Sequence, residues 1–283
     1  MKAILNLFKL RIGVAIALAA AAGIAVQEGT SLGGPGTLVL VMAVLVASAA
    51  AGAFNQYVEV DLDRRMARTQ GRPFVTGVLE HRPAWLWLIG AMILASVLAA
   101  SLSSNWIAGL YVFLGAFTYG VVYTVWLKRR TWWNIVVGGL AGSFAVLAGA
   151  AAVSPSLGPD ALALALVLFL WTPPHFWSLA IACKRDYERA GVPMLPVVVG
   201  DARAARAILA SAALLVTASI VPFFFDRGVV YLLAACAGGA YFLAKCLALV
   251  RRPMRMPARA AFLASLVQLC AVLFGAMLDV AIS

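Results

Sequence analysis

The stretch PAWLWLIGAMILASVLAASLSSNWIAGLYVFLGAFTYGVVYTVWL, residues 83–127, contains no charged side chain over 45 positions. A helix needs about 20 apolar residues to cross a bilayer, so this stretch is long enough for two crossings. The polar segment SLSSN at 101–105 divides it. The pattern therefore predicts a hairpin of two membrane-spanning helices, over 84–102 and 106–126.

The rest of the chain has the same character. It is 64% hydrophobic and 12% charged, whereas soluble domains carry about 25% charged residues. Its other charge-free runs do not alternate between polar and apolar residues, which excludes a β-barrel, and helices satisfy their own backbone hydrogen bonds in lipid. We therefore expect an all-α membrane protein with nine spans. These lie at 10–27, 36–54, 84–102, 106–126, 132–152, 161–183, 207–225, 228–249 and 260–281.

The distribution of basic residues predicts the orientation of these spans. Of the 22 Lys and Arg residues, 21 lie at the N-terminus or in loops after even-numbered spans, and Arg227 alone lies in a loop after an odd-numbered span. The positive-inside rule then places the N-terminus in the cytoplasm and the C-terminus outside, as in a multi-pass protein of the cell inner membrane. The net charge of +11 follows from this topology and from anionic lipid, and indicates no nucleic acid.

The stretch NQYVEVDLDRRMARTQGRP, residues 55–73, gathers charge in the first long cytoplasmic loop, 55–83. Asn55, Glu59 and Asp63 are spaced i, i+4, i+8, which places them on one face of a helix, with Asp61 pointing elsewhere. Oxygen donors of this kind suit Mg²⁺, and the arginines that follow suit phosphate. The alternative is a solvated helix at the membrane surface, although Glu59 and Asp63 then repel each other.

The second long cytoplasmic loop, 184–206, begins with Asp186 and Tyr187 directly after a span. If Asp186 faces Asp63 across a cavity, it could share the cation or hold a second one. By local chemistry alone, pairing with Lys184 or Arg189 is the better interpretation of Asp186.

Two histidines are candidates for a ligand site. His175 lies in TPPHFW near the cytoplasmic end of a span, where ionisable residues are functional candidates. Haem ligation competes there with a hydrogen bond to a backbone carbonyl freed by Pro173 or Pro174. His81 lies in the loop segment EHRP, where a surface position is the simpler interpretation.

Residues 55–73 resemble the motif N-x-x-x-[D/E]-x-D-x-D-x-x-M-x-R-T-x-x-R-P of the UbiA-type intramembrane prenyltransferase superfamily. Three further stretches resemble its protoheme IX farnesyltransferase branch. They are YTVWLKRRTWWNIVVGGLAG (123–142), WTPPHFWSLAI (171–181) and DYERAGVPMLPVV (186–198). The resemblance implies one domain over 1–283, with nine helices around a central cavity. Two positions depart from the superfamily, which has Asp where Glu59 stands and a second acid where Ala190 stands; the branch shares the second departure.

The resemblance also implies an activity: transfer of the farnesyl group from farnesyl diphosphate to a vinyl group of haem B, with addition of water, giving haem O. A haem A-forming enzyme or a terminal oxidase would then be a neighbour in the bilayer. The implied site residues fall into three groups. They are Asn55, Glu59, Asp63 and Asp186 for catalysis on Mg²⁺; Arg68, Arg72, Lys128, Asn134 and Tyr187 for the diphosphate; and His175 and His81 for haem.

Two other functions stay open from the residues alone. Another enzyme of the superfamily would prenylate a different aromatic or tetrapyrrole acceptor. A membrane transporter would carry ionisable residues near the middle of its spans, but here the acids gather at one surface.

Overall fold

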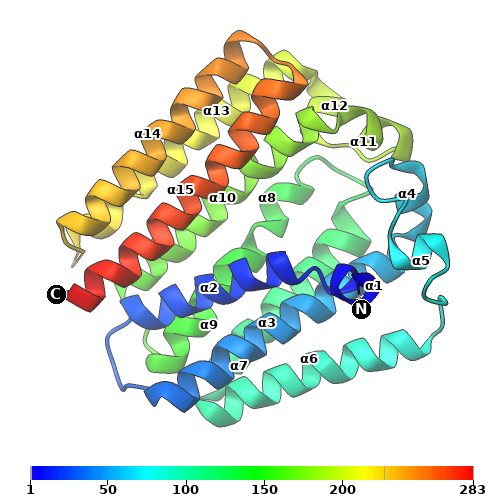
Figure 1. The fold of residues 1–283 in the computed structure, drawn as a ribbon. Helices are drawn as coiled ribbons and strands as arrows, with labels where there is room; N and C mark the ends of the chain where they lie inside the picture. Colours follow the sequence, from blue (N-terminus) through cyan, green and yellow to red (C-terminus); the bar gives the residue numbers. More distant parts are fainter. Residues whose placement is uncertain (1, 226, 283) are drawn as a thin grey trace.

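Long helices run side by side through the whole computed structural model, which describes residues 2–225 and 227–282 (Figure 1). Eight helical segments are long and apolar enough to cross a membrane. They are Gly33–Val58 (α3), Ala84–Ser103 (α6), Trp106–Leu127 (α7, Trp106–Phe117, and η1, Thr118–Leu127), Asn134–Val153 (α8, Asn134–Gly138, and α9, Leu140–Val153), Pro159–Ala182 (α10), Asp201–Phe224 (α13, Asp201–Ala218, and η2, Val221–Phe224), Val229–Arg251 (α14) and Arg255–Ile282 (α15). The all-α membrane architecture is confirmed.

A further apolar helix, α2, covers Leu10–Val26 and has 17 residues. The expected spans agree with the helices to within a few residues except at the starts of α13 and α15. These helices begin at Asp201 and Arg255, and not at 207 and 260. Arg203 and Arg206 lie in the first turns of α13, so this helix continues beyond the apolar segment that defined the expected span.

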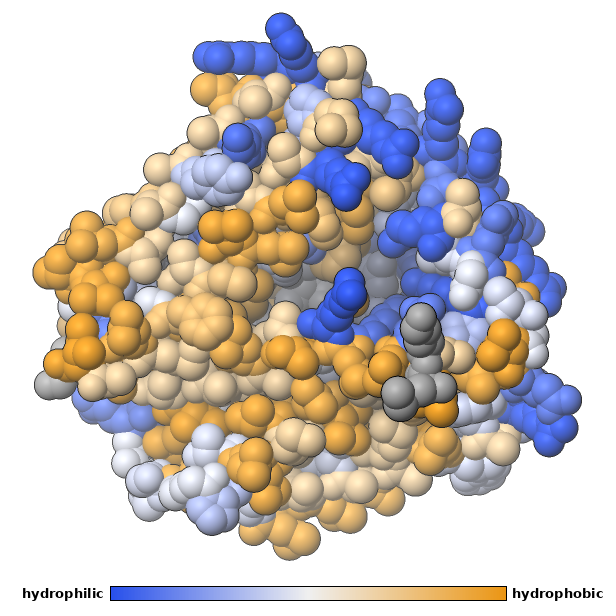
Figure 2. All heavy atoms as spheres, in the orientation of Figure 1, coloured by the Kyte–Doolittle hydropathy of each residue, from blue (hydrophilic) through white to orange (hydrophobic). Residues whose placement is uncertain are grey.

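The short helices gather at one end of the bundle (Figure 1). They are α1 (Lys2–Leu7), α4 (Val60–Arg65), α5 (Pro73–Thr76), α11 (Lys184–Ala190) and α12 (Leu195–Val199). Hydrophilic residues concentrate at the same end, whereas hydrophobic side chains cover much of the remaining surface in this view (Figure 2). On α6, for example, Trp87 and Leu102 are exposed, as expected of side chains that face lipid.

At the opposite end, Arg227 lies beside a buried acid. Its guanidinium forms an ion pair with Asp160 at 3.0 Å, and both side chains are about nine-tenths buried. The one basic residue that departs from the charge asymmetry is therefore neutralised within the protein.

The helices α2 and α9 pack with their backbones in direct contact. A Cβ atom on Gly23 would lie 2.1 Å from the Val146 carbonyl oxygen, and one on Gly149 would lie 2.0 Å from the Ala20 carbonyl oxygen. Such distances are far below van der Waals contact, so each glycine is required for this crossing. Small residues allow close approach of this kind in membrane helices.

We expect Gly23→Ala to lower the yield of folded protein sharply, because the added methyl group meets the backbone of α9, which cannot move without separating the helices. Gly90→Ala is the matched control, since a Cβ atom there has nothing within 4 Å. Size-exclusion chromatography of the detergent-solubilised variants would measure the yield. Equal yields of the two variants would contradict the tight crossing.

Candidate active site

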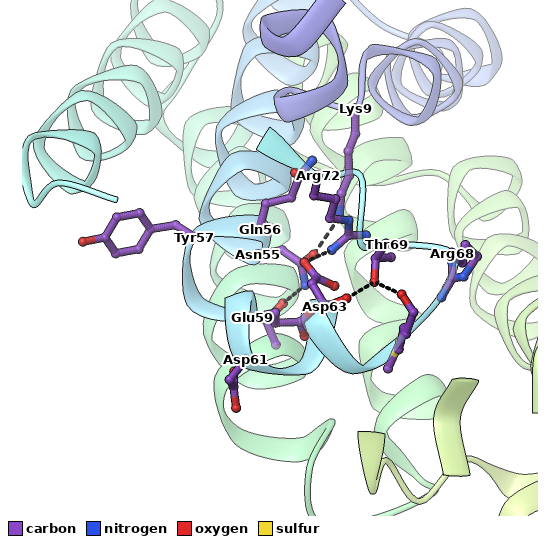
Figure 3. A network of polar contacts seen from close by, with 12 residues as sticks. Lys9, Asn55, Gln56, Tyr57, Glu59, Asp61, Asp63, Arg68, Thr69 and Arg72 are labelled. Carbon is purple, nitrogen blue, oxygen red and sulfur yellow. Dashed lines mark hydrogen bonds and ion pairs between the residues drawn. The ribbon is translucent and has the colours of Figure 1, made fainter. Parts of the chain in front are cut away.

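Asn55, Glu59 and Asp63 lie together where α3 ends and α4 begins. The helix is interrupted at Glu59, yet Glu59 N donates to the Asn55 carbonyl and Asp63 N to the Glu59 carbonyl, so the i, i+4 spacing is kept. The three residues are at most 2% exposed. Their side chains point toward a common region, and Asp61 points away from it (Figure 3). The structure thus shows the one-face arrangement, but in a buried position and not on a solvated helix.

Each of these oxygen donors is paired with a cation. Lys128 Nζ lies 2.5 Å from Glu59 Oε2, and Arg72 Nη1 lies 2.6 Å from Asp63 Oδ2. Lys9 Nζ donates to Asn55 Oδ1 at 2.6 Å. The cluster therefore carries its own positive charge around the oxygens that would face a metal ion or a phosphate group.

The two aspartates of α4 have opposite electrostatic environments. Burial raises the pKa of the Asp63 carboxyl, and the Arg72 guanidinium opposes that shift. The hydrogen bonds from Arg129 lower the pKa of Asp61, whose side chain is 51% exposed. Burial lowers the pKa of the Lys9 ammonium, and the nearby Arg72 guanidinium lowers it further.

A π-helix, η1, supplies the facing wall of the cluster. The Lys128 N–H donates to the Tyr123 carbonyl, and Thr124 Oγ1 donates to the Tyr119 carbonyl. The Asn55 amide donates to Thr124 Oγ1 at 3.0 Å, while Tyr119 and Lys128 contact Lys9 and Glu59. The i→i+5 spacing of this rare helix type, which is frequent at functional sites, brings these side chains to one side.

The second long loop, 184–206, contacts the first through Asp186. Its carboxylate accepts hydrogen bonds from the Ala67 N–H at 3.1 Å and the Arg68 N–H at 3.4 Å. Arg68 Nη2 donates to the Tyr187 hydroxyl at 3.3 Å. Within the described residues Asp186 forms no ion pair with Lys184 or Arg189, and Lys184 pairs instead with Glu188 and Asp201. The local-pairing interpretation of Asp186 is therefore wrong.

The donor set fits a hard cation. In the described part of the chain, no group of three or more His, Cys, Asp or Glu residues is arranged to hold a metal. The candidate ligands are instead an amide and two carboxylates, from Asn55, Glu59 and Asp63, with Asp186 in the adjoining loop. Such a mixed oxygen set suits Mg²⁺, which keeps several waters and bridges one or two carboxylates to phosphate.

His175 lies in a second, aromatic environment on α10. Its ring stacks on Trp171 with centroids 4.0 Å apart and lies 4.4 Å from Phe262. Its Nδ1 lies 2.7 Å from Ser265 Oγ, whose hydroxyl donates to the Phe262 carbonyl. With the Ser265 hydroxyl donating to that carbonyl, the matching tautomer of His175 has its proton on Nδ1 and a lone pair on Nε2. The partner of His175 is a hydroxyl on α15 and not a carbonyl of its own helix.

The remaining predicted residues lie apart from this arrangement or bond locally. His81 Nε2 lies 2.9 Å from the Tyr57 carbonyl, and its ring stacks on Tyr57 at 3.9 Å; Tyr57 points away from the acidic cluster (Figure 3). Asn134 is buried, and its amide nitrogen donates to the Thr131 carbonyl at 2.5 Å. The structure does not bring His81 to the acidic cluster.

Three residues of the cluster were not predicted from the sequence: Lys9, Tyr119 and Thr124. Lys9 was counted only as a basic residue before the first span, and nothing in the composition of 118–127 indicates a π-helix. These three side chains reach the cluster through the packing of α1 and η1 on α3, which joins segments far apart in the sequence.

Known proteins share both the sequence and the fold. A profile of the UbiA prenyltransferase family matches residues 15–269. Protoheme IX farnesyltransferase 2 of Paramagnetospirillum magneticum is 54% identical over 279 residues, 99% of this chain and 97% of that protein. Protoheme IX farnesyltransferase 1 of the same organism is 48% identical, covering 81% of each chain. A UbiA homolog from Archaeoglobus fulgidus bound to DMAPP and Mg²⁺ has a TM-score of 0.73 at 18% identity, covering 95% of this chain and 98% of that one.

The family profile covers most of the chain, and the nearly full-length identity extends beyond it at both ends. The site described above occupies the segments that carry the superfamily motif. This chain belongs to the UbiA prenyltransferase family.

Proposed function

We propose that this chain is a protoheme IX farnesyltransferase, which transfers the farnesyl group of farnesyl diphosphate to a vinyl group of haem B and so forms haem O and diphosphate. The observation that carries the proposal is the 54% identity to a protoheme IX farnesyltransferase over nearly the whole of both chains. The buried cluster of oxygen donors and cations gives that reaction a chemically suitable place.

Asn55, Glu59, Asp63 and Asp186 would hold Mg²⁺, and Arg68, Arg72, Lys128, Asn134 and Tyr187 would bind the diphosphate. The bound Mg²⁺ would neutralise charge that develops on the leaving diphosphate. The contacts support these assignments in part. Arg72 and Lys128 form ion pairs with Asp63 and Glu59, and Arg68 donates a hydrogen bond to Tyr187.

The chemistry needs no nucleophile from the protein. The bond between the farnesyl C1 and the diphosphate oxygen breaks, and the haem vinyl group forms a new carbon–carbon bond to C1. Water adds to the resulting porphyrin-stabilised cation and loses a proton, which gives the hydroxyl group of haem O. The buried cations would stabilise the departing diphosphate, a form of electrostatic catalysis that is strongest away from water.

Haem would bind within the bundle, with His175 Nε2 as the candidate axial ligand. Figure 2 shows a hollow near the middle of one face, between α15 and the short helices. His175 lies on α10 and bonds to Ser265 on α15. A neutral histidine with its other nitrogen held by a hydrogen bond is the usual arrangement for a metal ligand.

The proposed setting is the cell inner membrane, with a single domain over 1–283. We take α2 as the ninth span, with the N-terminus and the acidic cluster on the cytoplasmic side and the C-terminus outside. The basic loops and the short helices at one end support this orientation. A haem A-forming enzyme or a terminal oxidase is the proposed neighbour, because either would take up a membrane-bound haem product.

The test of the function is the identity of the acceptor. Membranes that contain this chain, supplied with farnesyl diphosphate, Mg²⁺ and haem B, should form a haem that elutes later in reversed-phase chromatography and has the mass of haem O. Prenylation of 4-hydroxybenzoate without any such haem would instead assign the chain to another branch of its family.

We expect His175→Ala to change the absorption spectrum of bound haem B, because the axial nitrogen ligand is lost. His81→Ala is the matched control and should leave the spectrum unchanged, since its Nε2 is already bonded to the Tyr57 carbonyl. The measurement is the Soret band of purified protein titrated with haem B. A spectrum that changes in neither variant would remove His175 as a ligand.

A further inference from the structure

Lys9 occupies an unusual backbone position between α1 and α2. With φ 47° it is the one non-glycine residue of the described ranges, 2–225 and 227–282, with a positive φ, a conformation that side chains other than glycine rarely adopt. Gln56 holds the preceding turn, because its buried amide donates to the Asn6 and Leu7 carbonyls. The backbone thus directs Lys9 inward in spite of its conformational cost.

The side chain of Lys9 crosses α3 at a glycine. A Cβ atom on Gly52 would lie 3.4 Å from Lys9 Cδ, so the aliphatic part of the lysine packs directly on the backbone of α3. Its ammonium reaches the centre of the cluster beside Arg72 (Figure 3). The lysine is therefore built into the site from a segment 46 residues away in the sequence.

The partners of this ammonium are neutral. Nζ donates to Asn55 Oδ1 at 2.6 Å and to the Tyr119 hydroxyl at 3.2 Å. Glu59 and Asp63 are paired with Lys128 and Arg72, and none of the described carboxylates lies within ion-pair distance of Lys9. With Lys9 protonated, the cluster holds three cations and two carboxylates, an excess of positive charge that an incoming anion would balance.

We propose that Lys9 is a further diphosphate ligand, whose ammonium releases the Asn55 amide when substrate binds and donates to a phosphate oxygen. Release leaves Asn55 Oδ1 free to face the metal ion, while Thr124 still holds the other end of that amide. An ammonium has three N–H donors and two are in use, so contact with phosphate can begin before Asn55 is released. This inference rests on the proposed function, because it takes a prenyl diphosphate as the substrate.

The test is the binding of Mg²⁺ and inorganic pyrophosphate to the purified full chain, measured by calorimetry. Lys9→Met keeps the aliphatic packing and removes the charge, and it should raise the pyrophosphate Kd about tenfold to a hundredfold, as for loss of one charge-assisted hydrogen bond. Arg65→Met removes an exposed cation of the same loop region and should leave the Kd unchanged. Lys9→Gly is a second variant in which the positive φ is favoured, so it keeps the test available if Lys9→Met folds poorly.

Thr124→Val separates direct binding from positioning of Asn55, because it removes the other hydrogen bond to the Asn55 amide. A larger loss of pyrophosphate affinity in Lys9→Met than in Thr124→Val would support direct contact. Equal losses in both, or a Kd within about twofold of wild type in both Lys9 variants, would overturn the proposal. Pyrophosphate binding requires no haem, so failure of the haem acceptor assay would be a separate result.

Discussion

Asp63→Asn is expected to lower farnesyl transfer about 10²–10³-fold or more, the usual cost of removing one preorganised electrostatic group. The substitution keeps the shape of the side chain but removes a buried carboxylate that is a proposed metal ligand. It also leaves Arg72 without its partner at 2.6 Å. The measurement is the rate of haem O formation at saturating farnesyl diphosphate, normalised to the amount of folded protein.

Asp61→Asn is the matched control for this experiment. Asp61 lies two residues away on α4, but it is exposed and pairs with Arg129, and it points away from the cluster (Figure 3). Its loss should change the rate little, because exposed ion pairs contribute about 0–1 kcal/mol. Comparable losses of rate in the two variants would contradict a specific role of Asp63 and favour a general role of these acids at the membrane surface.

Lys128→Met is expected to destabilise the protein by about 3–5 kcal/mol, because it leaves the Glu59 carboxylate buried without a counter-ion. Glu59 is fully buried, and both of its oxygens accept from Lys128 Nζ at 2.5–2.6 Å. Thermal unfolding in detergent would show the loss as a lowered Tm. Catalysis should be lost as well, since Lys128 is a proposed diphosphate ligand.

The double variant Glu59→Gln/Lys128→Met separates the two effects. Removing both charges relieves the burial penalty, so the Tm should return toward that of the wild type. The rate of haem O formation should stay low. A Tm that falls further in the double variant would mean that Lys128 stabilises the fold through contacts other than the one with Glu59.

The sequence predicted the all-α membrane architecture because lipid restricts the possible structures to a few. Long charge-free runs without alternation satisfy their backbone hydrogen bonds in lipid as helices, and the asymmetric distribution of basic residues indicates which helix ends share a side of the membrane. The i, i+4, i+8 spacing of Asn55, Glu59 and Asp63 likewise predicted a common face, and the structure keeps that face across the interruption at Glu59.

What the sequence did not predict depends on contacts between distant segments. The partners of the three donors come from residues 9, 72 and 128, and no local pattern connects these positions. The π-helical geometry that aligns Thr124 with Lys128 has no signature in composition. Local chemistry alone favoured pairing of Asp186 with Lys184 or Arg189 over a role beside Asp63, but Asp186 bonds to the first loop because the two loops pack together.

The chemistry of the contact between the two loops determines which substitutions can disrupt it. Asp186 bonds to the main-chain N–H groups of Ala67 and Arg68 and not to their side chains. Side-chain substitutions at positions 67 and 68 would leave both of these donors in place, whereas a substitution at position 186 would remove the acceptor. Residue 67 can therefore vary in side chain without losing the bond to Asp186, provided that it does not become proline. Arg68 cannot vary as freely, because its side chain also joins the two loops through Tyr187.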